Sequence, residues 1–389
     1  MNDSVNPISS INYIEAINNK LFLNINQMIE DSVRLTRNGL RFGGTVTLPS
    51  GHYYLSEPVR LHRLFGIKIV GQGMQTILTY VGDPSLPVFD LRDVRSPRIE
   101  SFCIKAQLDY VNGLPGALAA FCLSRHQTPD NNYNSSAAII HDIEFGSGNG
   151  LPDFKYGIMI SNQQWGGPDG NNENNTFSHL QISGCSEANF YIEAGSSQAT
   201  HNTKISRCGF TGGKYGFHTK STVNNVTLDF GGGYHTEADI FLEEVGGAGI
   251  RIHDCNSENS KRFLVTGGPT GATLKTRIEN CRFETNIVDH PDDYCIDFRS
   301  PGPLSMDFLD LSMNNRNPRI RVHTANPGSL SFTNANVRFN NPLPEDWKAK
   351  DLFFDSNGNW KKWIMNGKIN VYHNNDMITT VDADDLSDY

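Results

Sequence analysis

Three features of the sequence predict an all-β solenoid built from stacked coils. Short similar runs recur at nearly constant intervals, apolar and polar residues alternate within them, and turn-forming residues separate them. Among the 389 residues are 36 glycines, and asparagine occurs in runs such as 171–175. Glycine and asparagine tolerate the left-handed backbone of tight turns, whereas strict alternation is typical of a strand with one buried face. The chain should therefore consist of many short strands joined by many turns.

The repeat is clearest between residues 182 and 283. Four intervals of 23, 23, 24 and 26 residues separate the apolar residues that lead its runs, which are Ile182, Ile205, Leu228, Ile252 and Ile278. Looser copies extend the pattern upstream to Ile99 and downstream to Val337. A coil of this length cannot bury its inner face alone, so neighbouring coils must stack. We predict a right-handed parallel β-helix of roughly ten coils, with the five lead residues in one buried row.

Cysteine follows the lead residue by three positions in four of these five runs. Metal or disulfide chemistry is one interpretation, but nothing resembles a paired zinc motif. We favour an inward ladder of buried thiols, because a free cysteine packs as a small hydrophobe. No metal site and no cofactor are predicted.

The charge and hydropathy of the chain exclude some classes of partner. A net charge of −9 without a basic stripe argues against nucleic-acid binding. No apolar run has the length needed to cross a bilayer, so membrane insertion is not expected. The N-terminus, Met1–Ser4, lacks the basic and apolar regions of a secretory signal. A virion protein would reach the cell surface without such a signal, so a virion or extracellular location is expected.

The N-terminal region has a distinctive order of elements. Residues 24 to about 37 predict a helix, with Asn38-Gly39 as its stop signal. A Gly-Gly-Thr-Val strand at 43–46 and a Leu-Pro-Ser-Gly-His-Tyr run at 48–53 follow. This order resembles the opening of pectate-lyase-superfamily β-helix proteins, which include phage tailspike-type depolymerases. With the repeats downstream, the resemblance covers roughly residues 20–340.

The resemblance implies a fold and leaves the activity open, because this architecture hosts lyases, hydrolases, epimerases and binding proteins. In it, the helix covers the open end of the solenoid. The Asp pair with the Gly-His-Gly and Arg-Ile-Lys motifs of polygalacturonases is absent, as is the calcium-binding Asp set of pectate lyases. The predicted organisation is an arm and capping helix (1–39), a β-helix (40–341) and a C-terminal β segment (342–389).

The second strand of each coil should present one row of side chains to solvent. Alternation predicts one outward row containing Tyr191, His218, Phe241, Leu264 and Asp297, beside a row of Glu193, Lys220 and Glu243. Glycoside hydrolysis needs two carboxyl groups, for which Asp239 with Asp297 or Glu237 is the first choice. A β-eliminating lyase needs a base and cations instead, and His218, Lys220 and Arg262 fit those roles. The alternative is that these residues form weak cross-strand ion pairs.

Two insertions, 125–136 and 162–175, occupy the same turn of successive coils and should border this sheet. Their aromatic residues lie among amides, a composition suited to sugars because a ring stacks on the pyranose while amides bond its hydroxyls. A solvated loop is the alternative. The predicted substrate contacts are Trp165 and Tyr133 in the insertions, with Tyr191, Phe241, Arg262 and Arg299 on the sheet.

The C-terminal segment is rich in aromatic residues. Three of the chain's four tryptophans, Trp347, Trp360 and Trp363, lie after Pro344, where the repeat ends. So much aromatic surface should be covered, either by capping the solenoid or by packing against other subunits. We expect a homotrimer.

Three functions are compatible with these observations. The first is a virion-associated spike or adhesin that either binds a surface polysaccharide or both binds and cleaves it. The second is a free carbohydrate-active enzyme, either a polysaccharide lyase, a glycoside hydrolase or an epimerase. The third is a non-catalytic, capsid-decorating protein; the partner is a cell-surface glycan in the first case and other virion proteins in the last.

Overall fold

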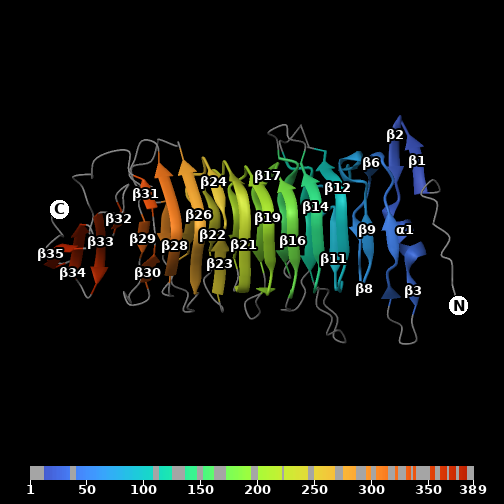
Figure 1. Cartoon of the computed structure of the whole chain (residues 1–389). Coiled ribbons are helices and arrows are strands. Elements are labelled where there is room, and N and C mark those ends of the chain that lie inside the picture. Colours follow the sequence, from blue (N-terminus) through green and yellow to red (C-terminus); the bar gives the residue numbers. More distant parts are fainter. Residues whose placement is uncertain are drawn as a thin grey trace.

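The protein is a right-handed parallel β-helix, as the sequence predicts (Figure 1). In the computed structural model, strands follow one another along the rod from the N-terminal to the C-terminal end. Side chains are described up to Asp307, and the backbone alone beyond it. The described residues are 13–35, 41–107, 114–124, 136–146, 152–161, 172–193, 200–220, 223–243, 249–267, 275–285, 295–298, 304–313, 320–322, 330–333, 336–338, 351–354, 360–365, 368–373 and 376–382.

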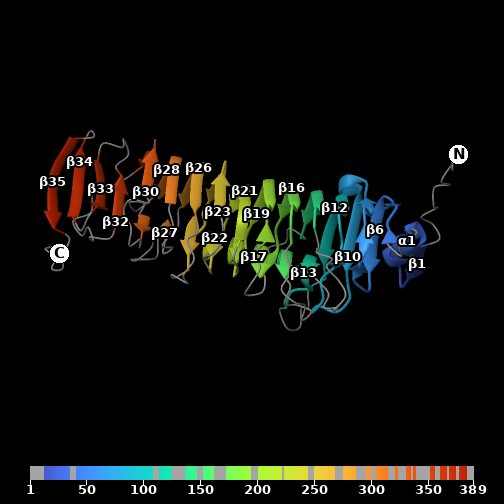
Figure 2. The ribbon, with the colours of Figure 1, turned by 90° about the horizontal axis from the view of Figure 1, so that it is seen from below.

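Two long sheets make up the wall of the solenoid, and Figure 2 shows their strands on opposite sides of the rod. Sheet A contains β1 (Ile14–Ile17), β2 (Lys20–Leu23), β5 (Thr45–Thr47), β6 (Gly51–Leu55), β9 (Lys68–Val70), β10 (Thr76–Tyr80), β12 (Arg98–Ala106), β14 (Ile139–Phe145), β16 (Thr176–Ile182), β18 (Thr200–His201), β19 (Lys204–Thr211), β21 (Val223–Gly233), β23 (Gly249–His253), β24 (Asn256–Glu258), β26 (Thr276–Thr285), β28 (Leu304–Met313), β30 (Leu330–Thr333) and β31 (Asn336–Arg338).

Sheet B carries the candidate site. Its strands are β7 (Val59–Arg60), β11 (Phe89–Arg92), β13 (Ala117–Ser124), β15 (Phe154–Ser161), β17 (Cys185–Glu193), β20 (Tyr215–Thr219), β22 (Ala238–Leu242), β25 (Leu264–Thr266), β27 (Ile296–Phe298), β29 (Ile320–Val322), β32 (Asp351–Phe354), β33 (Trp360–Met365), β34 (Lys368–His373) and β35 (Asp376–Asp382). A small sheet joins β3 (Arg34–Leu35), β4 (Arg41–Phe42) and β8 (Leu64–Phe65).

The main inward row of sheet A confirms the coil count and corrects one register. In the described side chains this row holds ten successive buried positions, which agrees with roughly ten coils. They are Val46, Ile69, Ile99, Ile140, Phe177, Ile205, Leu228, Ile252, Ile278 and Met306. All five predicted lead residues are buried. The prediction that Ile182 shares their row is wrong, because Phe177 pairs with Ile205 while Ile182 pairs with Phe210.

The false match has a physical cause. Both the Ile-Ser-Gly-Cys run at 182–185 and the Ile-Ser-Arg-Cys run at 205–208 bend at a left-handed third residue, Gly184 (φ 67°) and Arg207 (φ 54°). They bend at different corners of the coil, since Cys185 begins β17 opposite Phe154 in sheet B. Two similar turns therefore imitate one repeat.

Left-handed residues mark the corners of the solenoid, as the turn-rich composition predicts. At one corner asparagine side chains bond across coils. The Asn202 Nδ2 donates to Asn174 Oδ1 at 3.1 Å, and Asn225 Nδ2 donates to Asn202 Oδ1 at 3.2 Å. All three residues have positive φ. The abundance of asparagine therefore reflects a ladder of stacked turns.

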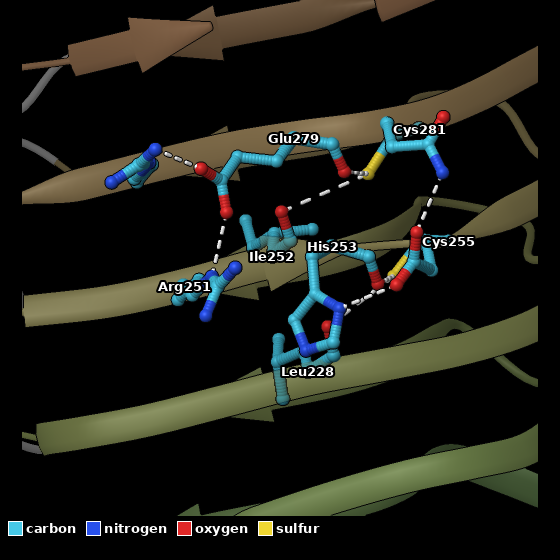
Figure 3. Close-up of polar contacts among 10 residues, drawn as sticks. Leu228, Arg251, Ile252, His253, Cys255, Glu279 and Cys281 are labelled. Atoms are coloured by element: carbon cyan, nitrogen blue, oxygen red, sulfur yellow. Dashed lines mark hydrogen bonds and ion pairs between the residues drawn. The ribbon is translucent and has the colours of Figure 1, made fainter. Parts of the chain in front are cut away.

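The cysteines are buried free thiols, as favoured above. Cys255 and Cys281 occupy neighbouring coils, and each thiol points to a carbonyl of the preceding coil, at 3.7 Å to Leu228 O and 3.8 Å to Ile252 O (Figure 3). Burial raises the pKa of the Cys208 thiol to about 11, which keeps it protonated and unreactive. These thiols fill space in the core.

The N-terminal helix covers the end of the solenoid but is shorter than predicted. Helix α1 (Ile25–Ser32) is capped by Asn24, whose side chain accepts from the Gln27 amide at 3.0 Å. Ile25, Met28 and Ile29 point into the core. The helix ends at Ser32 because Val33 is extended (ψ 135°) and β3 pairs antiparallel with β4. The helix was predicted to reach residue 37 because the sequence pattern of this segment carries no information about the pairing between β3 and β4.

Strand pairing changes character near the C-terminus. Strands β28, β30 and β31 pair in parallel, whereas β32 pairs antiparallel with β29 and β33 to β35 continue as an antiparallel meander. Side chains of this segment lie outside the described residues. The aromatic cap and the homotrimer stay predictions.

A buried carboxylate on the outer face of sheet A joins three coils. The Glu100 side chain, 8% exposed, accepts from Lys68 Nζ at 2.8 Å, pairs with Arg98, and lies 2.5 Å from His141 Nε2. Burial alone would raise the pKa of Glu100, but the hydrogen bonds from Lys68 and Arg98, together with His141, lower it to about 2. Because the folded pKa is lowered, the contribution of this group is present above the ordinary pKa and is lost as pH falls.

We expect Glu100→Gln to lower the free energy of unfolding at neutral pH by about 2 kcal/mol, since it weakens several charge-assisted hydrogen bonds. The difference from the unsubstituted protein should shrink as pH falls from 4.5 to about 2. Thermal unfolding followed across this range measures it, with the exposed Glu258→Gln as control. A difference that is independent of pH would contradict the electrostatic explanation.

Candidate functional site

The outward row of sheet B brings together residues from three coils, largely as predicted. Tyr191 of β17 pairs with His218 of β20, and His218 pairs with Phe241 of β22. The next position is Val265 and not Leu264, so this part of the predicted row is wrong. The amides of Phe263 and Leu264 both donate to the carbonyl of Cys295, at 2.8 and 3.1 Å. This bulge-like pairing turns Phe263 and Leu264 both inward and shifts the alternation by one residue.

Aromatic rings cluster on this face. The centroids of His218 and Phe241 lie 5.0 Å apart in a stacked arrangement, and Tyr215 lies 4.7 Å from His218 and 5.0 Å from Phe241. Tyr156 stacks on Tyr191 at 4.3 Å. Cys122 and Met159 continue the row of Tyr191 into the preceding coils, and Ala119 and Ala188 lie in the row of Tyr156 and Tyr215; all four are buried. We call Tyr156, Tyr191, Tyr215, His218 and Phe241 the aromatic face.

The aromatic face is only partly open to solvent. Tyr191 was predicted to contact substrate, but its ring is 2% exposed because Tyr156 and His218 pack against it. Tyr156, Tyr215 and Phe241 are half-buried and present the accessible ring surface. Burial and the neighbouring Glu187 raise the pKa of Tyr156 to about 12, so its hydroxyl stays protonated. Tyr191 is therefore a support for the other rings.

Sequence reasoning missed Tyr156 and Tyr215. In a regular strand, residues two positions apart face the same side. Tyr156 precedes the inward Ile158 by two positions and Tyr215 precedes the inward Phe217 by two, so alternation would place both tyrosines in the core. Both nevertheless join the outer cluster. An aromatic residue at the start of two sheet-B strands was the available signal.

Charged residues border the aromatic face. Glu193 is the last residue of β17, and Lys220 and Glu243 directly follow β20 and β22. The backbone hydrogen bonds from Lys220 N to Ile192 O and from Glu243 N to Thr219 O place the three in one row. Glu243 Oε2 lies 2.9 Å from His218 Nε2. On the other side Lys214 pairs with Glu187 at 2.9 Å. Carboxylates and ammonium groups therefore flank the rings on both edges.

The predicted pair of catalytic carboxylates is not on the surface. Asp239 is fully buried and Asp297 is 1% exposed, so the expectation that these carboxylates are solvated is wrong. Asp297 does keep its predicted place in the outward row, because it pairs with Val265. Asp297 occupies the row of Phe241 two strands further on, roughly 10 Å along the solenoid. Glu237 is 44% exposed and lies 3.6 Å from Lys261. The structure does not join the three carboxylates into one site.

Asp239 belongs instead to a buried polar network. His235 Nδ1 lies 2.7 Å from Asp239 Oδ1, and Ser260 Oγ donates to the same oxygen at 2.5 Å. His235 Nε2 donates to Asn189 Oδ1 at 2.9 Å, because the amide nitrogen of Asn189 already donates to Ile182 O. All four side chains are fully buried. In a nucleophilic triad the serine and the acid contact opposite ring nitrogens, whereas here both contact Nδ1.

The remaining sequence-predicted residues have different outcomes. His218 and Lys220 lie together at the aromatic face, and Arg262 precedes β25 with a half-buried side chain. Trp165, Tyr133 and Arg299 lie outside the described residues, as do most of both insertions. Among the described side chains, no group of three or more His, Cys, Asp or Glu could hold a metal ion. The helix present in that part is too short and polar to span a membrane.

The chain is similar in fold to several solved β-helix proteins, although it matches no protein-family model and no curated protein. A protein of Geobacillus virus E2 (ORF18) has a TM-score of 0.44 at 12% identity, covering 90% of this chain and 71% of its own. The gp42 tailspike of Acinetobacter phage vb_AbaP_AS12 has a TM-score of 0.41 at 10% identity, over 87% and 76%. A polygalacturonase from Erwinia carotovora has a TM-score of 0.38 at 12% identity, over 76% and 90%.

Proposed function

We propose that this β-helix binds polysaccharide along the outer face of sheet B, with the aromatic face as the platform for sugar rings. The observation that carries the proposal is the clustering of half-buried Tyr156, Tyr215 and Phe241 between charged edges. Pyranose rings present apolar C–H faces that stack on aromatic side chains, while their hydroxyls bond charged and amide groups. An elongated face of this kind suits a polymer.

The finer role that we propose is a virion-associated spike or adhesin directed at a surface glycan. Its support is the sequence, namely the tailspike-like opening and the aromatic C-terminal segment. A free carbohydrate-active enzyme and a capsid-decorating protein are the alternatives. Immunogold labelling of purified virions separates them, because only the spike and the decorating protein label, and glycan binding then separates those two.

Phe241→Ala and Tyr215→Ala are each expected to weaken polysaccharide binding about five- to tenfold, because each removes stacking surface of roughly 1–1.5 kcal/mol. Thermal unfolding should change little, since both rings are half-buried. Binding is measured by isothermal titration calorimetry against soluble capsular, uronate and neutral polymers. Tyr54→Ala on sheet A, also half-buried, is the matched control. Unchanged binding in both sheet-B variants would place the glycan elsewhere.

A further inference from the structure

We propose that Tyr234 forms a second sugar-binding subsite beside the aromatic face, and that the sugar it takes is an uncharged pyranose. The inference rests on the proposed glycan binding and extends the bound polymer around one corner of the solenoid. It follows from the backbone conformation of Tyr234, the exposure of its ring, the bare corner beside it and the charges around it.

Tyr234 lies at a corner where the backbone is left-handed in three successive coils. Gly212 (φ 72°), Tyr234 (φ 62°) and Asn259 (φ 57°) are equivalent residues there, because the strands that precede them pair in register. Glycine and asparagine adopt this conformation readily. A tyrosine is strained in it, since its Cβ crowds the following carbonyl oxygen. Strain of this kind is typical of residues whose side chains have a function.

The ring of Tyr234 is displayed and not packed. It is 58% exposed, and within the described part of the chain its side chain makes no hydrogen bond or ring contact. The next residue, His235, is fully buried, and its contacts with Asp239 and Asn189 hold the turn in place. The Tyr234 amide also donates to Glu258 O at 2.9 Å. The backbone that carries the ring is therefore fixed before a ligand arrives, which limits the entropy lost on binding.

No side chain covers the same corner in the preceding coil. Gly212 and Gly213 occupy it, both with positive φ (72° and 83°). A Cβ added at Gly212 would meet no atom within 4 Å, so the space beside this residue is open. Gly212 and Tyr234 are neighbours across the strand spacing of about 4.8 Å. The ring of Tyr234 therefore stands next to a stretch of bare backbone.

The turn that carries Tyr234 also borders the aromatic face. Glu237 N donates to the carbonyl of Lys214 at 3.1 Å, and Lys214 directly precedes Tyr215, the first residue of β20. Burial raises the pKa of Tyr215 and the Glu237 carboxylate raises it further, so the two side chains are close enough to interact. A polymer stacked on Tyr215 therefore reaches Tyr234 by crossing the bare corner.

The charges at this corner favour an uncharged sugar. Glu237 lies 3.6 Å from Lys261, and Lys214 pairs with Glu187 at 2.9 Å, so both cations are already compensated. Glu258 is exposed and forms no ion pair among the described residues. Its carboxylate repels an anionic sugar and accepts hydrogen bonds from hydroxyls. The net charge of −9 of the chain acts in the same direction.

The test measures binding to the full-length protein by isothermal titration calorimetry. Dextran and galactomannan are the neutral polymers and polygalacturonate is the charged one, and we expect a neutral polymer to bind more tightly. Tyr234→Asn removes the ring and keeps a residue suited to the left-handed backbone, so affinity for the neutral polymer should fall about five- to tenfold. Tyr234→Phe keeps the stacking surface and should bind within about twofold of the unsubstituted protein.

Thermal unfolding separates sugar binding from a structural role of the ring. Because asparagine relieves the strain, Tyr234→Asn should melt at the temperature of the unsubstituted protein or up to about 2 °C above it. Tyr234→Ala also lacks the ring but keeps the strain. It should therefore melt below Tyr234→Asn while binding the neutral polymer equally weakly.

Gly212→Asn tests the bare corner independently of Tyr234. Asparagine accepts a φ of 72°, and its side chain enters open space, so the variant should unfold at an unchanged temperature. The added side chain narrows the path between Tyr215 and Tyr234. Affinity for the neutral polymer should therefore fall in this variant too.

Three results would overturn the inference and leave the proposed binding function intact. The first is full affinity of Tyr234→Asn for a polymer whose binding Phe241→Ala weakens. The second is binding of polygalacturonate alone, which contradicts the uncharged sugar. The third is an equal fall in the melting temperatures of Tyr234→Asn and Tyr234→Ala, which would make the ring a structural element of the corner. If no polymer binds, the binding function fails together with the inference.

Discussion

Replacing Asp239 with asparagine is expected to lower the free energy of unfolding by about 3 kcal/mol, because it breaks a fully buried hydrogen-bonded pair. The carboxyl oxygen Oδ1 contacts both His235 Nδ1 and Ser260 Oγ, and none of these side chains reaches solvent. The other carboxylate oxygen, Oδ2, is buried without a hydrogen-bond partner, so an amide that keeps both Oδ1 contacts places an NH2 group there with no acceptor. The variant should therefore unfold at a lower temperature and a lower urea concentration.

Glu237→Gln is the control for this prediction. Glu237 is 44% exposed, and its contact with Lys261 spans 3.6 Å, so its loss should change stability by less than about 0.5 kcal/mol. Sequence reasoning placed Asp239 among the catalytic carboxylates. If Asp239→Asn folds as stably as the unsubstituted protein yet loses turnover of a glycan, a catalytic role of Asp239 is favoured over a structural role.

The space for His235 depends on one glycine. Asn189, Gly216 and Asp239 occupy equivalent positions on three neighbouring strands, and the imidazole lies over the middle one. A Cβ added at Gly216 would lie 3.0 Å from the His235 ring and 2.8 Å from the Asp239 carbonyl. The absent side chain thus lets one histidine join β17 to β22 beneath the aromatic face.

Phe121→Ala should have an effect of about 3–5 kcal/mol on the free energy of unfolding. The ring is fully buried in the inward row of sheet B, stacked on Phe89 at 4.7 Å and edge-on to Phe145 at 5.7 Å. Its removal leaves a cavity between coils that stacked strands cannot close. Urea unfolding measures the change, with Ile139→Ala, 40% exposed, as control. Equal losses in both variants would contradict the inward register of this row.

The sequence was sufficient for the architecture because periodicity is a direct consequence of the stacked coils. Ile205, Leu228, Ile252 and Ile278 repeat at one corner of the coil, so their spacing records its length. Ile182 misled because a turn at another corner uses the same residue types. The residue types of a turn do not show at which corner of the coil that turn lies.

The candidate site was predictable in part. Alternation placed Tyr191, His218 and Phe241 in one row, since parallel pairing keeps equivalent residues aligned. It did not reveal that Asp239 is covered by the 234–237 turn, because that contact depends on His235 bending back over Gly216. The contact between His218 and Glu243 likewise joins residues from two strands, and only the folded register brings them together.

Hydroxyl-radical footprinting with and without a bound polysaccharide tests the binding face most directly. We expect oxidation of Tyr215 and Phe241 to fall when the glycan is added, while that of Tyr54 on sheet A stays constant. Protection of Tyr54, with Tyr215 and Phe241 oxidised at their original rates, would contradict a glycan-binding site on the outer face of sheet B.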